Sequence, residues 1–283
     1  MTPDPERRSG RTSGSASAPH RATAGVGHLV VLLHGQPGDP QIWDGVQQHL
    51  AGHGLRLLAV DRPGYGSSQL EPGGFRHNAA ELIRLIEDRG GPAIVVAHSW
   101  AAAPALMAAR RSPELIDGLV LCAPVGDPSS VTLVDRLLGR TMLGRGLLRL
   151  GLALGGWLGA RPGGDRLLSA AGLGRLDRRG VQAATRPARN RRARRAAAIE
   201  QTALIEELAD VRRAAPSVAT PTVVIAGTHD GVVPPGAVGT LARTIRHARL
   251  IEVDGGHLVP VEHPSAVADA VLALVGDRAG PAQ

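Results

Sequence analysis

Lysine is absent from the 283 residues, so all 32 basic side chains are arginines. Aromatic residues make up only 2% of the chain, and the core must therefore be built from Val, Leu, Ile and Ala. The single cysteine, Cys122, excludes an internal disulfide. It ends an apolar stretch, which predicts a small buried thiol. Such a chain tolerates a reducing compartment, and we predict a cytoplasmic location.

Long apolar runs are also missing. The nearest case, residues 147–158, carries Arg149 and is shorter than the roughly 20 residues that a membrane span needs. The first two dozen residues hold arginines but lack the apolar core of a signal peptide. We therefore expect no integral membrane segment.

Acidic residues are outnumbered, which gives a net charge of +7. A basic chain raises nucleic acid as a partner. Much of the excess, however, lies in the N-terminal tail and between Arg178 and Arg195, and no nucleic-acid-reading element is recognisable. We expect no nucleic-acid partner.

A hydrophobic content of 43% and a charged content of 20% are typical of a folded globular protein. Residues 1–24 are rich in Ser, Pro, Arg, Ala and Gly, and we predict a disordered tail there. Short apolar runs then alternate with helical segments, and Asp39 and Asn78 are expected to cap two of these helices. The runs are residues 29–33, 55–60, 93–98, 118–122, 223–226 and 250–253.

Continuous apolar runs of this length are typical of parallel strands buried on both faces. The pattern predicts an α/β fold with a doubly wound, mostly parallel sheet of about six strands. Its core is expected to comprise residues 25–125 and 217–283. The intervening residues 126–216 are helical in character and should form a cap over the carboxyl edge of the sheet, where ligands bind. For Arg186–Arg195 a disordered linker is the alternative.

Three polar residues each follow a strand. Ser99 stands between a β-branched run and an alanine-rich helix, as a nucleophile does at a sharp strand-to-helix turn. Asp230 and His257 follow two later strands. A serine hydroxyl needs a base to take its proton, and His257 can do so while Asp230 orients the imidazole. Asp127 is an alternative acid. Metal-ligand clusters and Gly-rich nucleotide motifs are lacking, so we expect no metal and no cofactor.

Four blocks of sequence carry a resemblance to a known family. They are 33–38 (LHGQPG), 61–68 (DRPGYGSS), the turn at Ser99, and 227–234 together with 255–257. In this order, each just after a strand, they resemble the α/β-hydrolase fold superfamily, from about Leu29 to Gly276. The first block is similar to that family's His-Gly-x-Pro oxyanion loop.

The resemblance implies roles for several residues. The backbone N–H groups of Gln36 and Trp100 would form the oxyanion hole, and His34, Gly35 and Trp100 would contact substrate. His34 is expected to shape the loop rather than move protons. The Trp100 indole either faces the pocket or packs against the cap. His98 is expected to make a structural hydrogen bond.

The chain departs from the family in two ways. Ala97 and Ala101 stand where the family elbow usually has glycine, and the usual leading antiparallel hairpin has no counterpart in the sequence. His229, beside Asp230, could be mistaken for the base, but its position favours His257 in that role.

These features predict a cofactor-free serine hydrolase. It would cleave an ester or related acyl bond of a small, moderately hydrophobic molecule through an acyl-enzyme. Alternatives on the same triad are a C–C bond hydrolase, a prolyl aminopeptidase, an acyltransferase or a perhydrolase, and a non-enzymatic ligand receptor stays open. Epoxide and haloalkane relatives generally use an aspartate nucleophile, so Ser99 argues against them. The sequence does not indicate an oligomeric state.

Overall fold

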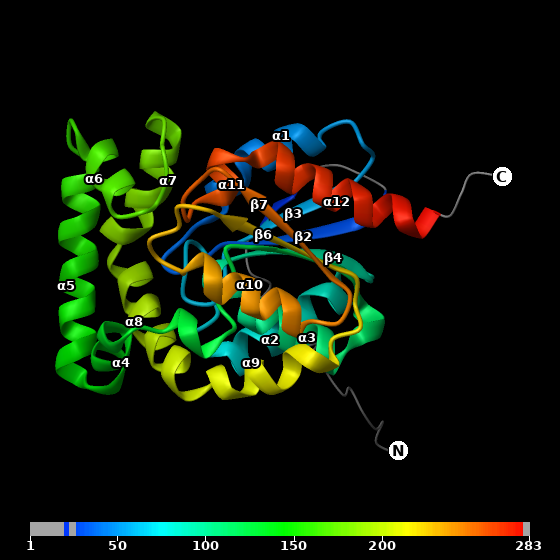
Figure 1. Ribbon diagram of the computed structural model, residues 1–283, viewed down its shortest axis with the longest axis horizontal. Coiled ribbons are helices and arrows are strands. Elements are labelled where there is room, and N and C mark those ends of the chain that lie inside the picture. The colour runs from blue at the N-terminus through cyan, green and yellow to red at the C-terminus, as the bar shows by residue number, and fades with distance from the viewer. Residues whose placement is uncertain (1–19, 23–26, 280–283) are drawn as a thin grey trace, which may run out of the picture.

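The computed structural model describes residues 20–22 and 27–279, and its centre is a seven-stranded sheet in the order β1-β3-β2-β4-β5-β6-β7 (Figure 1). Neighbouring strands from β2 to β7 are parallel, which confirms the predicted six-stranded parallel sheet. These strands are β2 (Leu29–Leu33), β3 (Arg56–Val60), β4 (Ala93–His98), β5 (Ile116–Cys122), β6 (Thr222–Gly227) and β7 (Ala248–Val253).

The seventh strand, β1 (His20–Ala22), was not expected. It pairs antiparallel with β3, with His20 opposite Val60, at the edge of the sheet. Backbone pairing at an edge satisfies the free N–H and C=O groups of β3 and needs no apolar side chains, which is why composition gave no sign of it. The prediction of a disordered tail is thus wrong for these three residues. The rest of that tail lies outside the described residues.

Helices cover both faces of the sheet, and each face packs on its own core. Alternate residues of β2 show this, since Val31 and Leu33 belong to one apolar cluster and Val30 and Leu32 to the other. The first cluster includes α2 (Phe75–Asp88), α3 (Ala102–Arg111) and α10 (Pro235–Thr244). The second includes α1 (Asp44–Leu50), α11 (Val259–Glu262) and α12 (Pro264–Ala279).

One of the two predicted helix caps is confirmed. The Asp39 carboxylate accepts the N–H of Gln41 at the start of a 3-10 turn that leads into α1. The prediction for Asn78 is wrong, because α2 begins at Phe75 and Asn78 lies in its first turn. Its buried amide donates to the carbonyls of Gly73 and Gly74. Asn78 therefore makes buried hydrogen bonds within the first turn of α2 and does not cap the helix.

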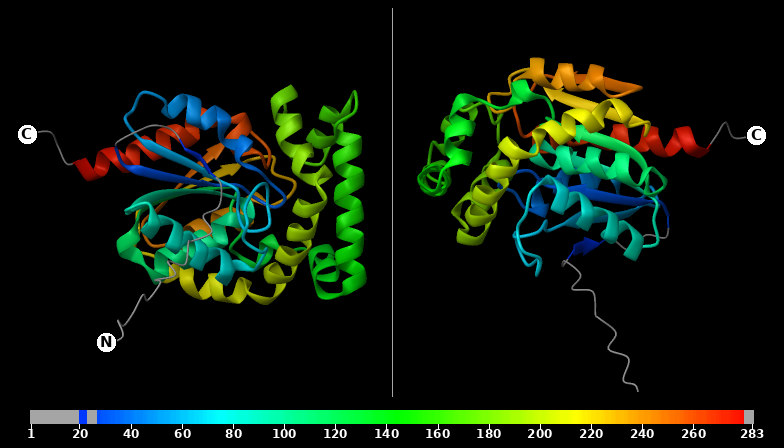
Figure 2. Two further views of the ribbon diagram at one scale, coloured as in Figure 1. Left: turned by 180° about the vertical axis from the view of Figure 1, so that it is seen from behind. Right: turned by 90° about the horizontal axis from the view of Figure 1, so that it is seen from below.

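The insertion between β5 and β6 is helical, and five of its helices stand beyond the carboxyl ends of the strands (Figures 1 and 2). Helix α5 is the outermost of them, at the left of Figure 1. These cap helices are α4 (Leu133–Arg140), α5 (Met142–Gly159), α6 (Gly164–Ala170), α7 (Arg178–Arg189) and α8 (Arg191–Glu206).

Two parts of the insertion require comment. Its last helix, α9 (Leu208–Ala214), packs against α3 on the body of the protein instead of over the strand ends. The segment Arg186–Arg195 is helical, so the linker alternative is wrong. Only Asn190 interrupts it, where the side-chain oxygen accepts the N–H groups of Arg192 and Ala193 to start α8. Among the described helices, none is long and apolar enough to cross a membrane.

Candidate active site

Ser99 is held at a strained turn between β4 and α3. Its φ is +53°, in the left-handed region that non-glycine residues rarely occupy. A short 3-10 turn over Ser99–Ala101 connects the strand to the helix. Ala97 and Ala101, which replace the expected glycines, are both fully buried, so the packing around this turn accommodates their methyl groups.

Gly35 makes the close approach of the first loop to Ser99 possible. A Cβ atom at this position would lie 2.8 Å from His98 Nδ1 and 3.1 Å from Ser99 Cβ. Any side chain here would push the loop away from the serine. Glycine is therefore required at this point for steric reasons.

The structure brings together the three predicted residues that follow β4, β6 and β7. Ser99 Oγ lies 2.9 Å from His257 Nε2, and His257 Nδ1 lies 2.8 Å from Asp230 Oδ2. All three side chains are buried. A serine, an imidazole and a carboxylate in one hydrogen-bonded row can deprotonate the serine as it attacks an electrophile.

Asp230 is itself fixed by the backbone. Its Oδ1 accepts the N–H groups of Val232 and Val233, at 2.7 and 2.9 Å, which leaves Oδ2 for His257. The alternative acid, Asp127, instead caps a short turn and accepts the N–H of Ser129. His229 is exposed and faces Asp254, as expected of a residue that is not the base.

His98 makes the structural hydrogen bond that was predicted for it. Its Nε2–H donates to the backbone carbonyl of His257, at 2.9 Å, and so connects β4 to the loop of the base. Burial, reinforced by the nearby His257, lowers the pKa of His98 to about 3. His98 therefore stays neutral at ordinary pH.

Two residues expected to contact substrate are buried behind the site. His34 is fully buried, and its Nε2 accepts the N–H of Arg62. The Trp100 indole is 1% exposed, donates to the carbonyl of Glu200 and packs against Phe75. Neither lines the cavity next to His257, and their contact with substrate stays a prediction. Gly35 does line that cavity.

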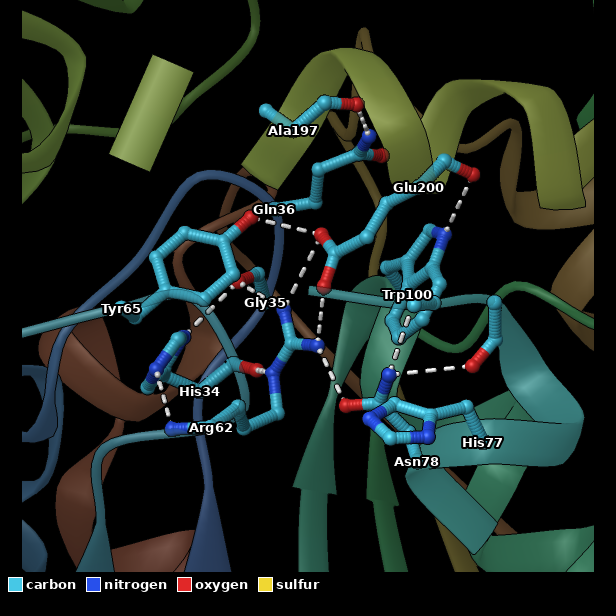
Figure 3. A network of polar contacts seen from close by, with 12 residues as sticks. His34, Gly35, Gln36, Arg62, Tyr65, His77, Asn78, Trp100, Ala197 and Glu200 are labelled. Carbon is cyan, nitrogen blue, oxygen red and sulfur yellow. Dashed lines mark hydrogen bonds and ion pairs between the residues drawn. The ribbon is translucent and has the colours of Figure 1, made fainter. Parts of the chain in front are cut away.

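A buried polar network connects the loop of Gly35 to the cap, and sequence reasoning missed it (Figure 3). Arg62, just after β3, forms an ion pair with Glu200 of α8, with Nη1 2.5 Å from Oε1. The same guanidinium donates to the backbone carbonyls of His34 and Gly35, at 2.7 and 2.8 Å. One side chain thereby fixes both the first loop and the cap.

Aromatic rings complete this network. The Tyr65 hydroxyl donates to Glu200, at 2.6 Å, and the Arg62 guanidinium carbon lies 4.9 and 4.6 Å from the ring centroids of Tyr65 and Trp100. Burial raises the pKa of the Glu200 carboxyl and of the Tyr65 hydroxyl. Arg62 opposes the rise at both groups. Gln36 adds a further contact with α8, because its amide donates to the carbonyl of Ala197.

The segment after α6 is hydrogen-bonded to the loop that carries His257. The carbonyl of Gly172 accepts the N–H of His257, at 2.9 Å, and that of Gly231, at 3.3 Å. Glu262 accepts the N–H groups of Gly256 and Arg175. The cap is thus joined to the loops that carry Asp230 and His257 by hydrogen bonds of the backbone and of the Glu262 side chain.

A mainly apolar cavity of about 460 Å³ opens beside His257, beneath the cap. The first loop contributes Gly35 and Gln36, and small or aliphatic residues of the cap form the opposite wall. The cap residues are Gly151, Leu152, Gly155, Gly156, Leu158, Gly159, Leu167, Leu168, Ala171, Leu173, Ala183, Ala184, Thr185 and Ala188.

A doubly wound sheet with a strained serine after one strand, hydrogen-bonded to a histidine after the last, is typical of one class of fold. The family model of the alpha/beta hydrolase family matches residues 30–270. The chain belongs to this family, which places it among hydrolase-type enzymes.

Individual relatives share limited sequence identity with the chain. The chain is 33% identical over 99 residues to epoxide hydrolase B of Mycobacterium tuberculosis, a match that covers 33% of this chain and 28% of that protein. It is 28% identical over 263 residues to a pimeloyl-acyl-carrier-protein methyl ester esterase of Xanthomonas campestris, covering 90% and 98% of the two chains.

Solved structures share the fold. A thermophilic esterase from Thermogutta terrifontis has a TM-score of 0.67 at 22% identity, covering 92% of this chain and 93% of that one. A haloalkane dehalogenase from Bradyrhizobium elkani has a TM-score of 0.71 at 23% identity, covering 93% and 99%. At these identities the likeness concerns the fold alone.

Proposed function

We propose that the protein is a cofactor-free serine hydrolase that cleaves an ester or related acyl bond through an acyl-enzyme. The observation that carries the proposal is the hydrogen-bonded row Ser99–His257–Asp230 at a strained turn. Ser99 is the nucleophile, His257 the general base and Asp230 the residue that orients the imidazole.

The reaction proceeds in two halves. His257 takes the Ser99 proton as Oγ attacks the acyl carbon, and the backbone N–H groups of Gln36 and Trp100 donate to the developing oxyanion. The intermediate then expels the alcohol, which receives the proton from His257, and leaves an acyl group on Ser99. Water, deprotonated by the same histidine, attacks this ester and releases the acid.

The substrate is a small, moderately hydrophobic molecule. The cavity beside His257 supports this, since its cap wall consists mainly of glycines, alanines and leucines and its volume of about 460 Å³ lies within the range of small-molecule sites. The esterase relative, matched over 98% of its own length, supports an ester bond. The predicted cytoplasmic location remains part of this proposal.

A fluorophosphonate probe tests the nucleophile. We expect covalent labelling of the wild-type protein at Ser99 and none of Ser99→Ala. Ser129→Ala, which alters a surface serine next to Asp127, is the matched control and should label normally. Labelling that persists in Ser99→Ala would refute the assignment.

A panel of p-nitrophenyl esters of increasing acyl length tests the bond and the substrate class. We expect kcat/KM to rise with acyl length until the cavity is filled, and Ser99→Ala to lower kcat by at least about 10³-fold. Absence of turnover across the panel, despite labelling of Ser99, would exclude a general esterase and favour a different bond.

A further inference from the structure

The outer side of α5 is an exposed apolar stripe. Leu143, Leu147, Leu150, Leu154 and Trp157 follow one another at spacings of four and three residues, which places them on one face of the helix. Between 47% and 75% of each side chain is exposed. The opposite face of α5 lines the cavity, so the stripe points away from it.

Helix α4 packs against α5 and extends this apolar surface. Its Leu133, Val134 and Leu137 are 61–79% exposed. We call these eight side chains of α4 and α5 the outer cap face. Figure 1 shows α5 as the outermost layer at the cap end of the molecule. Large apolar side chains exposed together on two packed helices are typical of a binding surface.

The charged residues exposed on α4 to α6 and the turn after α5 are mostly arginines. The exposed cations are Arg136, Arg140, Arg149, Arg161 and Arg166, and the exposed anion is Asp165. Asp135 is engaged in the capping box that starts α4. The surface is therefore apolar and positively charged.

Trp157 and Arg161 join the two properties at the end of α5. The Arg161 guanidinium carbon lies 3.4 Å from the Trp157 ring centroid, so cation and indole form one unit. Leucines, a tryptophan and flanking arginines on one helix are typical of helices that lie in the interface of an anionic membrane.

A second copy of the chain fits this surface less well. In a two-fold symmetric dimer the patch would meet a second patch of the same positive charge. An anionic lipid surface complements both the apolar stripe and its cations. We propose that the outer cap face docks on the surface of membranes that contain anionic phospholipids, independently of the reaction at Ser99.

Flotation with lipid vesicles tests this proposal. Vesicles of phosphatidylcholine and phosphatidylglycerol in equal parts are compared with phosphatidylcholine alone, at low and high salt. We expect the wild-type protein to float with the anionic vesicles, and less so at high salt. Leu143→Gln/Leu147→Gln/Leu150→Gln/Leu154→Gln should lower the partition coefficient at least about tenfold, because it removes the apolar area that the membrane would bury.

Charge substitutions separate the electrostatic contribution. Arg136→Gln/Arg140→Gln/Arg149→Gln should lower binding to anionic vesicles by roughly fivefold per arginine near the surface. The matched control, Arg110→Gln/Arg111→Gln/Arg243→Gln, removes the same charge from α3 and α10 and should have a clearly smaller effect.

Three results would overturn the proposal. One is failure of the wild-type protein to bind anionic vesicles at low salt. Another is unchanged binding after the four leucine substitutions in a variant whose circular dichroism shows an intact fold. The third is a lipid-free dimer, seen by light scattering, that the same substitutions dissociate, which would make this face an interface between copies.

Discussion

The two sides of the cap invert the usual distribution of polar and apolar residues. Helix α8 turns alanines and one fully buried carboxylate, Glu200, toward the body of the protein. Helix α5 turns a row of leucines outward, with Leu143 75% exposed. The inner side is therefore held by directional hydrogen bonds and an ion pair, and the outer side has apolar surface left unburied. Changes on the inner side should affect folding, whereas changes on the outer side should affect association only.

Acid should have the largest effect on stability, through two buried histidines in the body of the protein beneath the cap. Burial lowers the pKa of His98 to about 3, and burial together with Arg62 lowers that of His34 well below its ordinary value. Below about pH 6.5 the unfolded chain therefore binds more protons than the folded one. The free energy of unfolding should decrease as the pH is lowered, by up to about 1.4 kcal/mol per pH unit for each histidine. Urea unfolding between pH 7 and pH 4 measures this, and His98→Gln should flatten the slope.

Removal of one partner of the buried ion pair comes next. Glu200→Ala leaves the Arg62 guanidinium without its counter-charge and should cost about 3–5 kcal/mol of unfolding free energy. Arg62→Met/Glu200→Met removes both charges and should recover part of that loss, because the carbonyls of His34 and Gly35 and the Tyr65 hydroxyl still lose their partners. A Glu200→Ala variant as stable as wild type in urea would mean that the inner side is not held by this pair.

Tyr65→Phe should have a smaller effect. It removes the hydroxyl that donates to Glu200, at 2.6 Å, and keeps the ring next to Arg62. We expect a loss of roughly 1–3 kcal/mol, as for a hydrogen bond to a charged group. Thermal and urea unfolding measure it. A loss as large as that of Glu200→Ala would assign the stabilisation to the tyrosine rather than to the ion pair.

A substitution on the outer side of the cap should have the smallest effect on stability. Leu147→Gln replaces a side chain that is 53% exposed with another good helix former, and the unfolding free energy should change by no more than about 0.5 kcal/mol. Its stability should also depend on pH as that of the wild type does. A loss above about 1 kcal/mol would contradict the contrast between the two sides of the cap.

The strands and the hydrogen-bonded row Ser99–His257–Asp230 could be predicted because their signals are local. A strand buried on both faces is a short apolar run, and Ser99, Asp230 and His257 each stand where such a run ends. The order of these runs along the chain then brings the three side chains to one edge of the sheet. The short edge strand β1 has no such run, and its backbone pairing left no trace in composition.

The network behind the site could not be predicted because its partners are remote in sequence. Arg62 and Glu200 are separated by 138 positions, and the helix that carries Glu200 belongs to an insertion whose packing no local pattern specifies. Arg62 and Tyr65 belong to the block 61–68, which the resemblance singled out. That block indicated a loop after a strand but did not indicate Glu200 as its partner. The position of the Trp100 indole depends on the same helix, since it donates to the carbonyl of Glu200.

The carbonyl of Gly172 gives the cap a mechanical constraint. It accepts hydrogen bonds from the backbones of His257 and Gly231, which follows Asp230, and so joins the cap to both loops. Opening of the whole cap would break these hydrogen bonds and disturb the alignment of His257 with Ser99.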